Sequence, residues 1–217
     1  MVADHVGFLF FPELIIFRLI GRLSFPIFAF LISEGYKYTR DFKKYLWRIF
    51  LFFVISEPIY LYAFNPPNFE ILNIFFVLFL SLIAIYLYDK IDNKKYGLFV
   101  VFLISALGIL IGADYNFFGI LLIFSFHLYN IKTEFKKLLF VQLILIILLI
   151  IYINFLYLSN NLILPICWLL SQFIYLIPLF LIRYYNGQRG KNIKYFFYIF
   201  YPLHILILGL IAHLIQF

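Results

Sequence analysis

The chain has 217 residues, of which 66% are hydrophobic and only 12% are charged. A soluble domain is about half apolar and about one quarter charged, so this composition excludes an ordinary soluble protein. The net charge of +7 does not indicate nucleic-acid binding, because the charges lie in short loops between apolar segments, where membrane topology explains them better.

Apolar segments follow one another along the whole chain. A membrane-spanning helix needs roughly 20 apolar residues, and Leu138–Leu158 and Leu162–Ile182 meet this requirement most clearly. The sequence therefore predicts an all-α, polytopic transmembrane helix bundle that forms a single membrane-embedded domain over residues 1–217. We expect about nine segments, at 2–11, 14–35, 44–64, 72–88, 98–112, 117–128, 138–158, 162–182 and 195–215.

The basic residues of the loops predict an orientation in the membrane. Loops that carry Lys and Arg alternate along the chain with loops that carry none. Cytoplasmic loops are the ones enriched in Lys and Arg, so we expect the amino end in the cytoplasm, the carboxyl end outside, and a multi-pass protein of the cytoplasmic (inner) membrane. The basic loops and their borders contain Lys37, Arg40, Lys43, Lys44, Arg48, Lys90, Lys94, Lys95, Lys132, Lys136, Lys137, Arg183, Arg189, Lys191 and Lys194, whereas the other set contains Glu13, Glu70 and Asp114.

Two arginines, Arg18 and Arg22, lie inside the second segment. They are four residues apart and therefore share one face of a helix. Ionisable groups within a span are costly and are usually functional. The structural alternatives are an ion pair, or side chains that extend toward the outer surface near the helix end.

Several ionisable groups converge at one depth. At about 1.5 Å per residue, Arg18 and Arg22 lie about 6 Å and about 12 Å below the outer surface, Glu57 about 10 Å below it and His5 about 9 Å below it. Tyr115 follows Asp114 at the outer mouth of the fifth segment. These groups come from different helices, so the sequence predicts a polar pocket in the outer half of the membrane.

The stretch Asp4-His5 lies in the first segment, which is too short to cross a bilayer. Neighbours on a helix point about 100° apart, so these two side chains do not form a catalytic pair with each other. We expect His5 to meet a carboxylate from another helix, such as Glu57, and Asp4 to neutralise either Arg18 or Arg22.

The remaining histidines are weaker candidates for a site. His204 follows Pro202 near the middle of the last segment, and it is either a functional residue or a core histidine bonded to a neighbouring helix. His127 and His213 lie near opposite membrane surfaces, where an interfacial position is expected. Because the four histidines lie at unlike depths, no metal site is expected.

Four blocks of the sequence, in this order, resemble the TraX family: "DHVGFLFFP", "RLIGRLSFPIFAFLISEGYKYTRDFKKYLWRIFLFFVISEPIY", "ADYNFFGILLI" and "FFYIFYPLHILIL". The likeness runs across nearly the whole chain, and the second block is the most specific. The family in turn resembles a wider group of membrane acyltransferases that includes heparan-α-glucosaminide N-acetyltransferase. Family members usually carry further residues before the Asp-His element, so we expect either a native start upstream of Met1 or a shortened member.

The resemblance implies an integral-membrane acetyltransferase with acetyl-CoA as the cytoplasmic donor. The acceptor it implies is an amine or hydroxyl, on a pilin amino terminus or an envelope glycan, that is approached from the outer side or within the membrane. By position, His5 is the catalytic histidine that the resemblance implies.

These roles form a mechanistic hypothesis. His5 acts as general base or acyl carrier, Arg18 or Arg22 stabilises the oxyanion or holds an anionic group, and Glu57 orients His5 or balances an arginine. Tyr115 and His204 are expected to contact donor or acceptor. The alternative is a small-anion transporter or channel that uses Arg18 and Arg22, although the chain shows no internal repeat of the kind many transporters have.

Overall fold

The computed structural model describes residues 1–64, 72–159, 166–188 and 194–215. Glu70, Arg189 and Lys191, which contributed to the predicted orientation, lie outside the described residues. Within them the chain is helical, and the only pairing of extended backbone is a single bridge between Leu72 and Ala113. The all-α prediction is confirmed.

The helices follow the apolar segments of the sequence closely. Two segments are broken: a turn at Leu23 divides the second, and a 3-10 stretch interrupts the eighth. The elements are α1 (Val2–Phe10), α2 (Ile15–Arg22), α3 (Ser24–Tyr38), α4 (Phe42–Phe64), α5 (Ile74–Lys90), α6 (Lys94–Leu110), α7 (Asn116–Leu128), α8 (Phe135–Ser159), α9 (Ile166–Leu170), η2 (Ser171–Leu176), α10 (Ile177–Ile182) and α11 (Lys194–Ile215).

Four helices of the described chain are long and apolar enough to cross a membrane, judged by length and composition. They are Ile15–Tyr38, which joins α2 to α3, then Phe42–Phe64, Phe135–Leu158 and Tyr195–Ile215. These helices indicate a membrane protein. The count of nine segments and the cytoplasmic amino end stay predictions.

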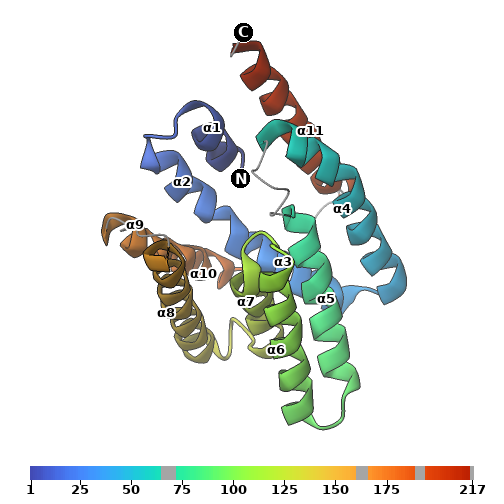
Figure 1. Ribbon diagram of the computed structural model, residues 1–217. Coiled ribbons are helices and arrows are strands. Elements are labelled where there is room, and N and C mark those ends of the chain that lie inside the picture. The colour runs from blue at the N-terminus through green and yellow to red at the C-terminus, as the bar shows by residue number, and fades with distance from the viewer. Residues whose placement is uncertain (65–71, 160–165, 189–193, 216–217) are drawn as a thin grey trace.

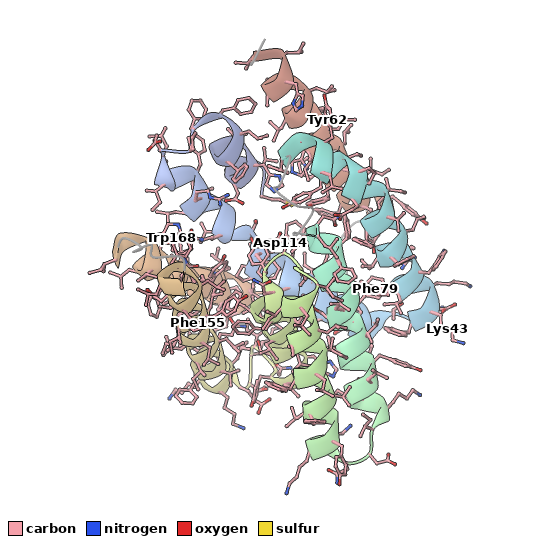
Figure 2. All side chains as sticks on the ribbon, in the orientation of Figure 1. Lys43, Tyr62, Phe79, Asp114, Phe155 and Trp168 are labelled. Atoms are coloured by element: carbon pink, nitrogen blue, oxygen red, sulfur yellow. The ribbon has the colours of Figure 1, made fainter. Side chains whose placement is uncertain are left out.

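The helices form two groups that meet at the centre of the molecule (Figure 1). One group contains α1 and α2 together with α4 and α11, which run parallel to each other, and the other contains α5, α6 and α7 with α8 beside α7. Helix α3 packs against α7 and connects the two groups. Asp114 lies where the groups meet, on the segment between α6 and α7 (Figure 2).

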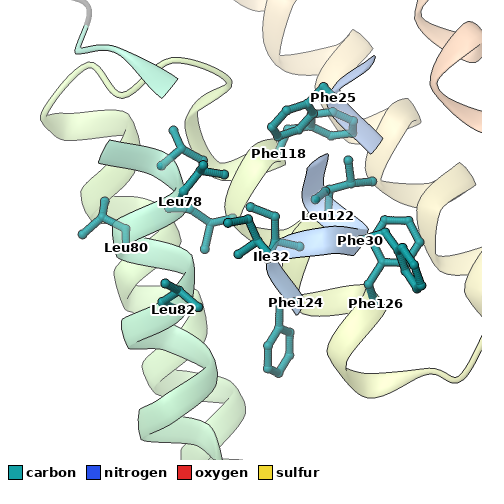
Figure 3. Packing of buried hydrophobic residues seen from close by; sticks show 14 of the residues in the cluster. Phe25, Phe30, Ile32, Leu78, Leu80, Leu82, Phe118, Leu122, Phe124 and Phe126 are labelled. Carbon is teal, nitrogen blue, oxygen red and sulfur yellow. The ribbon is translucent and has the colours of Figure 1, made fainter. Parts of the chain in front are cut away.

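The core lies between α3, α5 and α7. Figure 3 shows Ile32 of α3 facing Leu78 of α5 and Leu122 of α7, all members of one buried cluster. Lipid is as apolar as these side chains, so helices in a membrane are held by close van der Waals packing more than by the hydrophobic effect. Small residues permit such packing: a Cβ added at Gly209 of α11 would lie 2.8 Å from the Cβ of Ala63 on α4.

Candidate functional site

A cavity of about 620 Å³ opens between the two groups of helices. Its acidic, basic and histidine side chains come from α1, α2 and the segment before α7, and its apolar lining comes mostly from α3, α4, α5, α7 and α11. The cavity reaches along α4 from Tyr45 to Phe64, which is about 28 Å of helix. The polar and charged side chains around it include Asp4, His5, Arg18, Arg22, Ser24, Tyr60, Asp114, Tyr115, Asn116, Gln172, Tyr175, Tyr198 and Tyr201.

Asp4 of α1 forms an ion pair with Arg18 of α2, with 3.1 Å between Oδ1 and Nη1. The arginine Cζ also lies 5.4 Å from the centre of the Phe8 ring. Sequence spacing allowed Asp4 to neutralise either Arg18 or Arg22, and the structure selects Arg18. This pair fixes α1 against α2 at the edge of the cavity.

Gly21 allows α1 and α2 to come this close. A Cβ added at Gly21 would overlap the backbone and side chain of Asp4. Any larger residue must therefore push α1 away from α2 and move the neighbouring His5 with it.

Gly21→Ala is accordingly expected to destabilise the protein by about 1–3 kcal/mol, the usual cost of overpacking. Gly108→Ala is the control, because the new methyl would meet only the terminal Cδ1 of Ile120, at 2.9 Å, and that flexible end can move. Thermal unfolding in detergent measures both variants. Equal losses of stability at the two glycines would contradict the close contact at Asp4.

Arg22 is the more buried of the two arginines, with 8% of its surface exposed. Its guanidinium donates a hydrogen bond to the Ser171 hydroxyl and lies over the Trp168 ring, with 4.9 Å between Cζ and the ring centre. In the described part of the chain, no carboxylate lies within ion-pair distance of Arg22. Arg22 therefore brings a positive charge to the cavity that no ion pair neutralises.

His5 packs in an aromatic box formed by α4 and α11. Its ring centre is 5.0 Å from that of Phe64, 6.3 Å from that of Tyr201 and 5.1 Å from that of His204. His204 Nδ1 lies 2.7 Å from the Phe200 carbonyl oxygen, which can only accept, so Nδ1 carries the proton. Two buried ring nitrogens, His5 Nδ1 and His204 Nε2, have no hydrogen-bond partner in the part of the chain that the structure describes. Buried polar atoms are rarely left in this state unless they have a function or a ligand.

Glu57 has a different partner from the one expected from the sequence. Its Oε2 accepts hydrogen bonds from both the backbone nitrogen and the side-chain Nδ2 of Asn73, at 3.1 and 2.6 Å. Asn73 also caps α5, because its Oδ1 accepts from the backbone N–H of Phe75. The contacts of His5 are with aromatic rings and His204, and Glu57 is not part of the cavity lining. In this structure Glu57 anchors the start of α5.

Asn73→Ala is expected to reduce stability by about 1–3 kcal/mol, because it removes a helix cap and a buried partner of the Glu57 carboxylate. Asn93→Ala provides the control, since Asn93 caps α6 in the same way, with its Oδ1 accepting from the backbone nitrogen of Lys95, but is exposed. Unfolding temperatures should fall clearly more for Asn73. A larger loss at Asn93 would show that the Glu57 contact contributes little.

The segment between α6 and α7 brings Asp114 and Tyr115, both predicted from the sequence, to the cavity. Leu72 pairs with it through two backbone hydrogen bonds, to Gly112 and from Asp114. Tyr115 has φ of 58°, a left-handed conformation that is uncommon for a bulky residue. Its ring stacks on Phe25, with 3.9 Å between ring centres. Strained backbone of this kind tends to occur at functional sites.

The structure thus brings Asp4, His5, Arg18, Arg22 and Tyr115 to one cavity. His204 is not part of the cavity lining, but its ring contacts the His5 ring. Within the described residues, no group of three or more His, Cys, Asp or Glu side chains could hold a metal ion.

Sequence reasoning missed the contribution of the eighth segment, where Trp168, Ser171 and Gln172 surround Arg22 or line the cavity. The sequence does contain a sign of this contribution, because Ser and Gln interrupt an otherwise apolar run in "CWLLSQF". Trp168 lies on the outer flank of the molecule, where α9 begins the broken segment (Figure 2).

Comparison with known proteins gives a consistent picture. A probable fimbrial assembly protein, FimC of serogroup H1 from Dichelobacter nodosus, is 26% identical over 223 residues, which cover 96% of this chain and 89% of the relative. No solved structure matches the chain. The family described as TraX protein matches residues 1–212, and the chain therefore belongs to the TraX family.

Proposed function

We propose that the protein is a multi-pass acetyltransferase of the inner membrane that moves an acetyl group from cytoplasmic acetyl-CoA to an amine or hydroxyl acceptor. The observation that carries this proposal is the placement of His5: its ring lines a large cavity that also contains Arg22, a cation that has no carboxylate partner among the described residues. A base and a cation facing one space are the two groups that acyl transfer requires.

His5 takes the proton of the attacking amine or hydroxyl. Imidazole suits this step because, unperturbed, it changes charge near neutral pH. The acceptor atom then bonds to the thioester carbonyl carbon, the carbon–sulfur bond breaks, and the departing thiolate receives the proton from His5. In the variant mechanism His5 itself carries the acetyl group before the acceptor attacks.

Arg22 is the better candidate for stabilising the oxyanion, because the charge of Arg18 is already balanced by Asp4. Asp4 then acts by holding Arg18 and the position of α1. Arg18, Tyr115 and His204 remain candidates for contacts with the donor. The His204 ring contacts the His5 ring, so it can also help to hold the His5 imidazole in place.

The acceptor we favour is a pilin amino terminus, with an envelope glycan as the other possibility. Support comes from the family and from the relative, whose name refers to fimbrial assembly. The chemistry of the site demands only a nucleophile that can approach His5, and sites of one fold often act on different substrates.

A transporter or channel for a small anion is the competing function, and the free charge of Arg22 is the observation in its favour. Proteoliposomes that contain the purified protein separate the two. Transfer of labelled acetyl from acetyl-CoA to pilin or envelope extract, without uptake of labelled acetate or phosphate, supports the acetyltransferase. Uptake without transfer contradicts it.

A further inference from the structure

A second cavity, of about 480 Å³, lies at the opposite end of α3, α5 and α7 from the site of His5. This is the end that the loop charges predict to be cytoplasmic. We call it the basic pocket, and it is lined by Tyr36, Lys37, Thr39, Arg40, Phe42, Tyr86, Asp89, Lys90 and His127.

The basic pocket has two cations that no carboxylate of the described residues neutralises. Lys37 is paired with Glu34 at 3.1 Å. Arg40 and Lys90 have no ion pair within the described residues. The one carboxylate of the lining, Asp89, is already occupied: His127 Nε2 lies 2.9 Å from one oxygen, and the Tyr36 hydroxyl donates to the other at 2.9 Å. The pocket therefore favours an anion.

One wall of the basic pocket is flat and aromatic. The rings of Phe42 and Tyr86 stack at 4.4 Å with only 4° between their planes. Lys90 Nζ lies 5.7 Å from the centre of the Tyr86 ring, so a cation borders the aromatic surface. Such a combination of ring face and cation suits a ligand that joins an aromatic base to phosphate.

The basic pocket adjoins the main cavity. Phe42 lines the former and Tyr45 the latter, and the two residues are one turn apart on α4, about 4.5 Å along its axis. The Tyr45 hydroxyl fills the space beside Gly35, where an added Cβ would lie 2.6 Å from it. Beyond Tyr45 the cavity is mainly apolar until it reaches Arg18, Arg22 and His5.

We infer that the basic pocket holds the phosphorylated nucleotide end of the acyl donor, while the uncharged arm passes Tyr45 into the main cavity. This inference rests on the proposed function. Its basis is the match between a donor with an anionic aromatic head and a long neutral arm, and a protein with a basic aromatic pocket beside a long, mostly apolar cavity.

The test measures CoA binding by calorimetry to the full chain in nanodiscs of phosphatidylcholine. The double variant Arg40→Gln with Lys90→Gln removes the two unpaired charges, and we expect it to weaken CoA binding by about tenfold or more. Lys132→Gln with Lys136→Gln is the control, because it makes the same charge change at exposed residues that line neither cavity. It should leave the affinity within about twofold of the original.

Fragments of the donor show which part the pocket holds. Binding of ADP should weaken in the Arg40 and Lys90 variant, whereas binding of pantetheine, which has no nucleotide, should not change. Anionic phosphatidylglycerol in the nanodiscs tests a lipid headgroup as the source of phosphate. If binding of phosphatidylglycerol weakens in the double variant while binding of CoA does not, the pocket belongs to the lipid headgroup and the inference is overturned.

The outcomes distinguish the inference from the proposed function. If the unmodified protein binds CoA and the Arg40 and Lys90 variant binds it equally well, the inference is wrong and the acetyltransferase proposal stands. If the unmodified protein neither binds CoA nor transfers acetyl, both fail.

Discussion

His5→Ala is expected to lower acetyl transfer by about 10²–10⁴-fold, the usual contribution of a positioned acid–base group. The loss follows because no other histidine of the described chain lines the cavity. His5→Gln should be equally inactive, since an amide cannot take a proton at neutral pH. Release of CoA thiol in proteoliposomes, in the presence of acceptor, measures the rate.

The control for this variant is His213→Ala. His213 lies in the last turn of α11, where its Nδ1 is 3.1 Å from the Gly209 carbonyl oxygen and its ring stacks on Tyr62, and it is not part of the cavity lining. This variant should retain nearly full activity. Correctly folded His5→Ala protein that transfers acetyl at the normal rate would eliminate His5 as base and as acyl carrier.

Arg22→Met is expected to lower kcat by about 10²–10³-fold, as the loss of an oxyanion-stabilising group does in other enzymes. Methionine keeps much of the volume of the side chain but removes the charge. Because the arginine contacts are directional, Arg22→Lys should recover only part of the rate. Rates at saturating acetyl-CoA separate this effect from weaker donor binding.

Arg183→Met is the control that tests whether the fall in kcat is specific to an arginine of the cavity. Arg183 also lies over an aromatic ring, with its Cζ 4.8 Å from the Phe135 ring centre, but it is exposed and does not line the cavity. Its loss should change kcat by less than about twofold. If Arg22→Met folds and keeps the kcat of the unmodified protein, the charge of Arg22 does not stabilise the oxyanion.

The positions of the helices could be predicted from the sequence because apolar length is what a membrane selects. The breaks within segments could not. At the turn at Leu23, the Leu23 backbone N–H donates to the Ile20 carbonyl at 3.3 Å, and the Ser24 hydroxyl donates to the Gly21 carbonyl at 2.6 Å. The 3-10 stretch Ser171–Leu176 lies in a run of the sequence, 162–182, that is apolar enough to be predicted as one continuous segment. Hydropathy reports composition and does not report backbone hydrogen bonding.

The meeting of Arg18, Arg22 and His5 in one cavity could also be predicted from the sequence, because helical rise and the alternation of loops place them in one layer. The hydrogen-bond partners of these side chains could not be predicted. Arg22 bonds Ser171, a residue 149 positions away, and the rotation of each helix decides such contacts. For the same reason the sequence could not show that Glu57 contacts Asn73 and not His5. Asn73 lies just before α5, the helix that follows the helix of Glu57.

Mass spectrometry of envelope proteins and glycans tests the central claim most directly. Cells that lack the gene are complemented with the unmodified protein, with His5→Ala or with His213→Ala. The mechanism predicts that one acetyl group, on a pilin amino terminus or an envelope glycan, is absent without the gene, returns with the unmodified and His213→Ala proteins, and does not return with His5→Ala. An acetylation pattern that is the same in all four strains would contradict it.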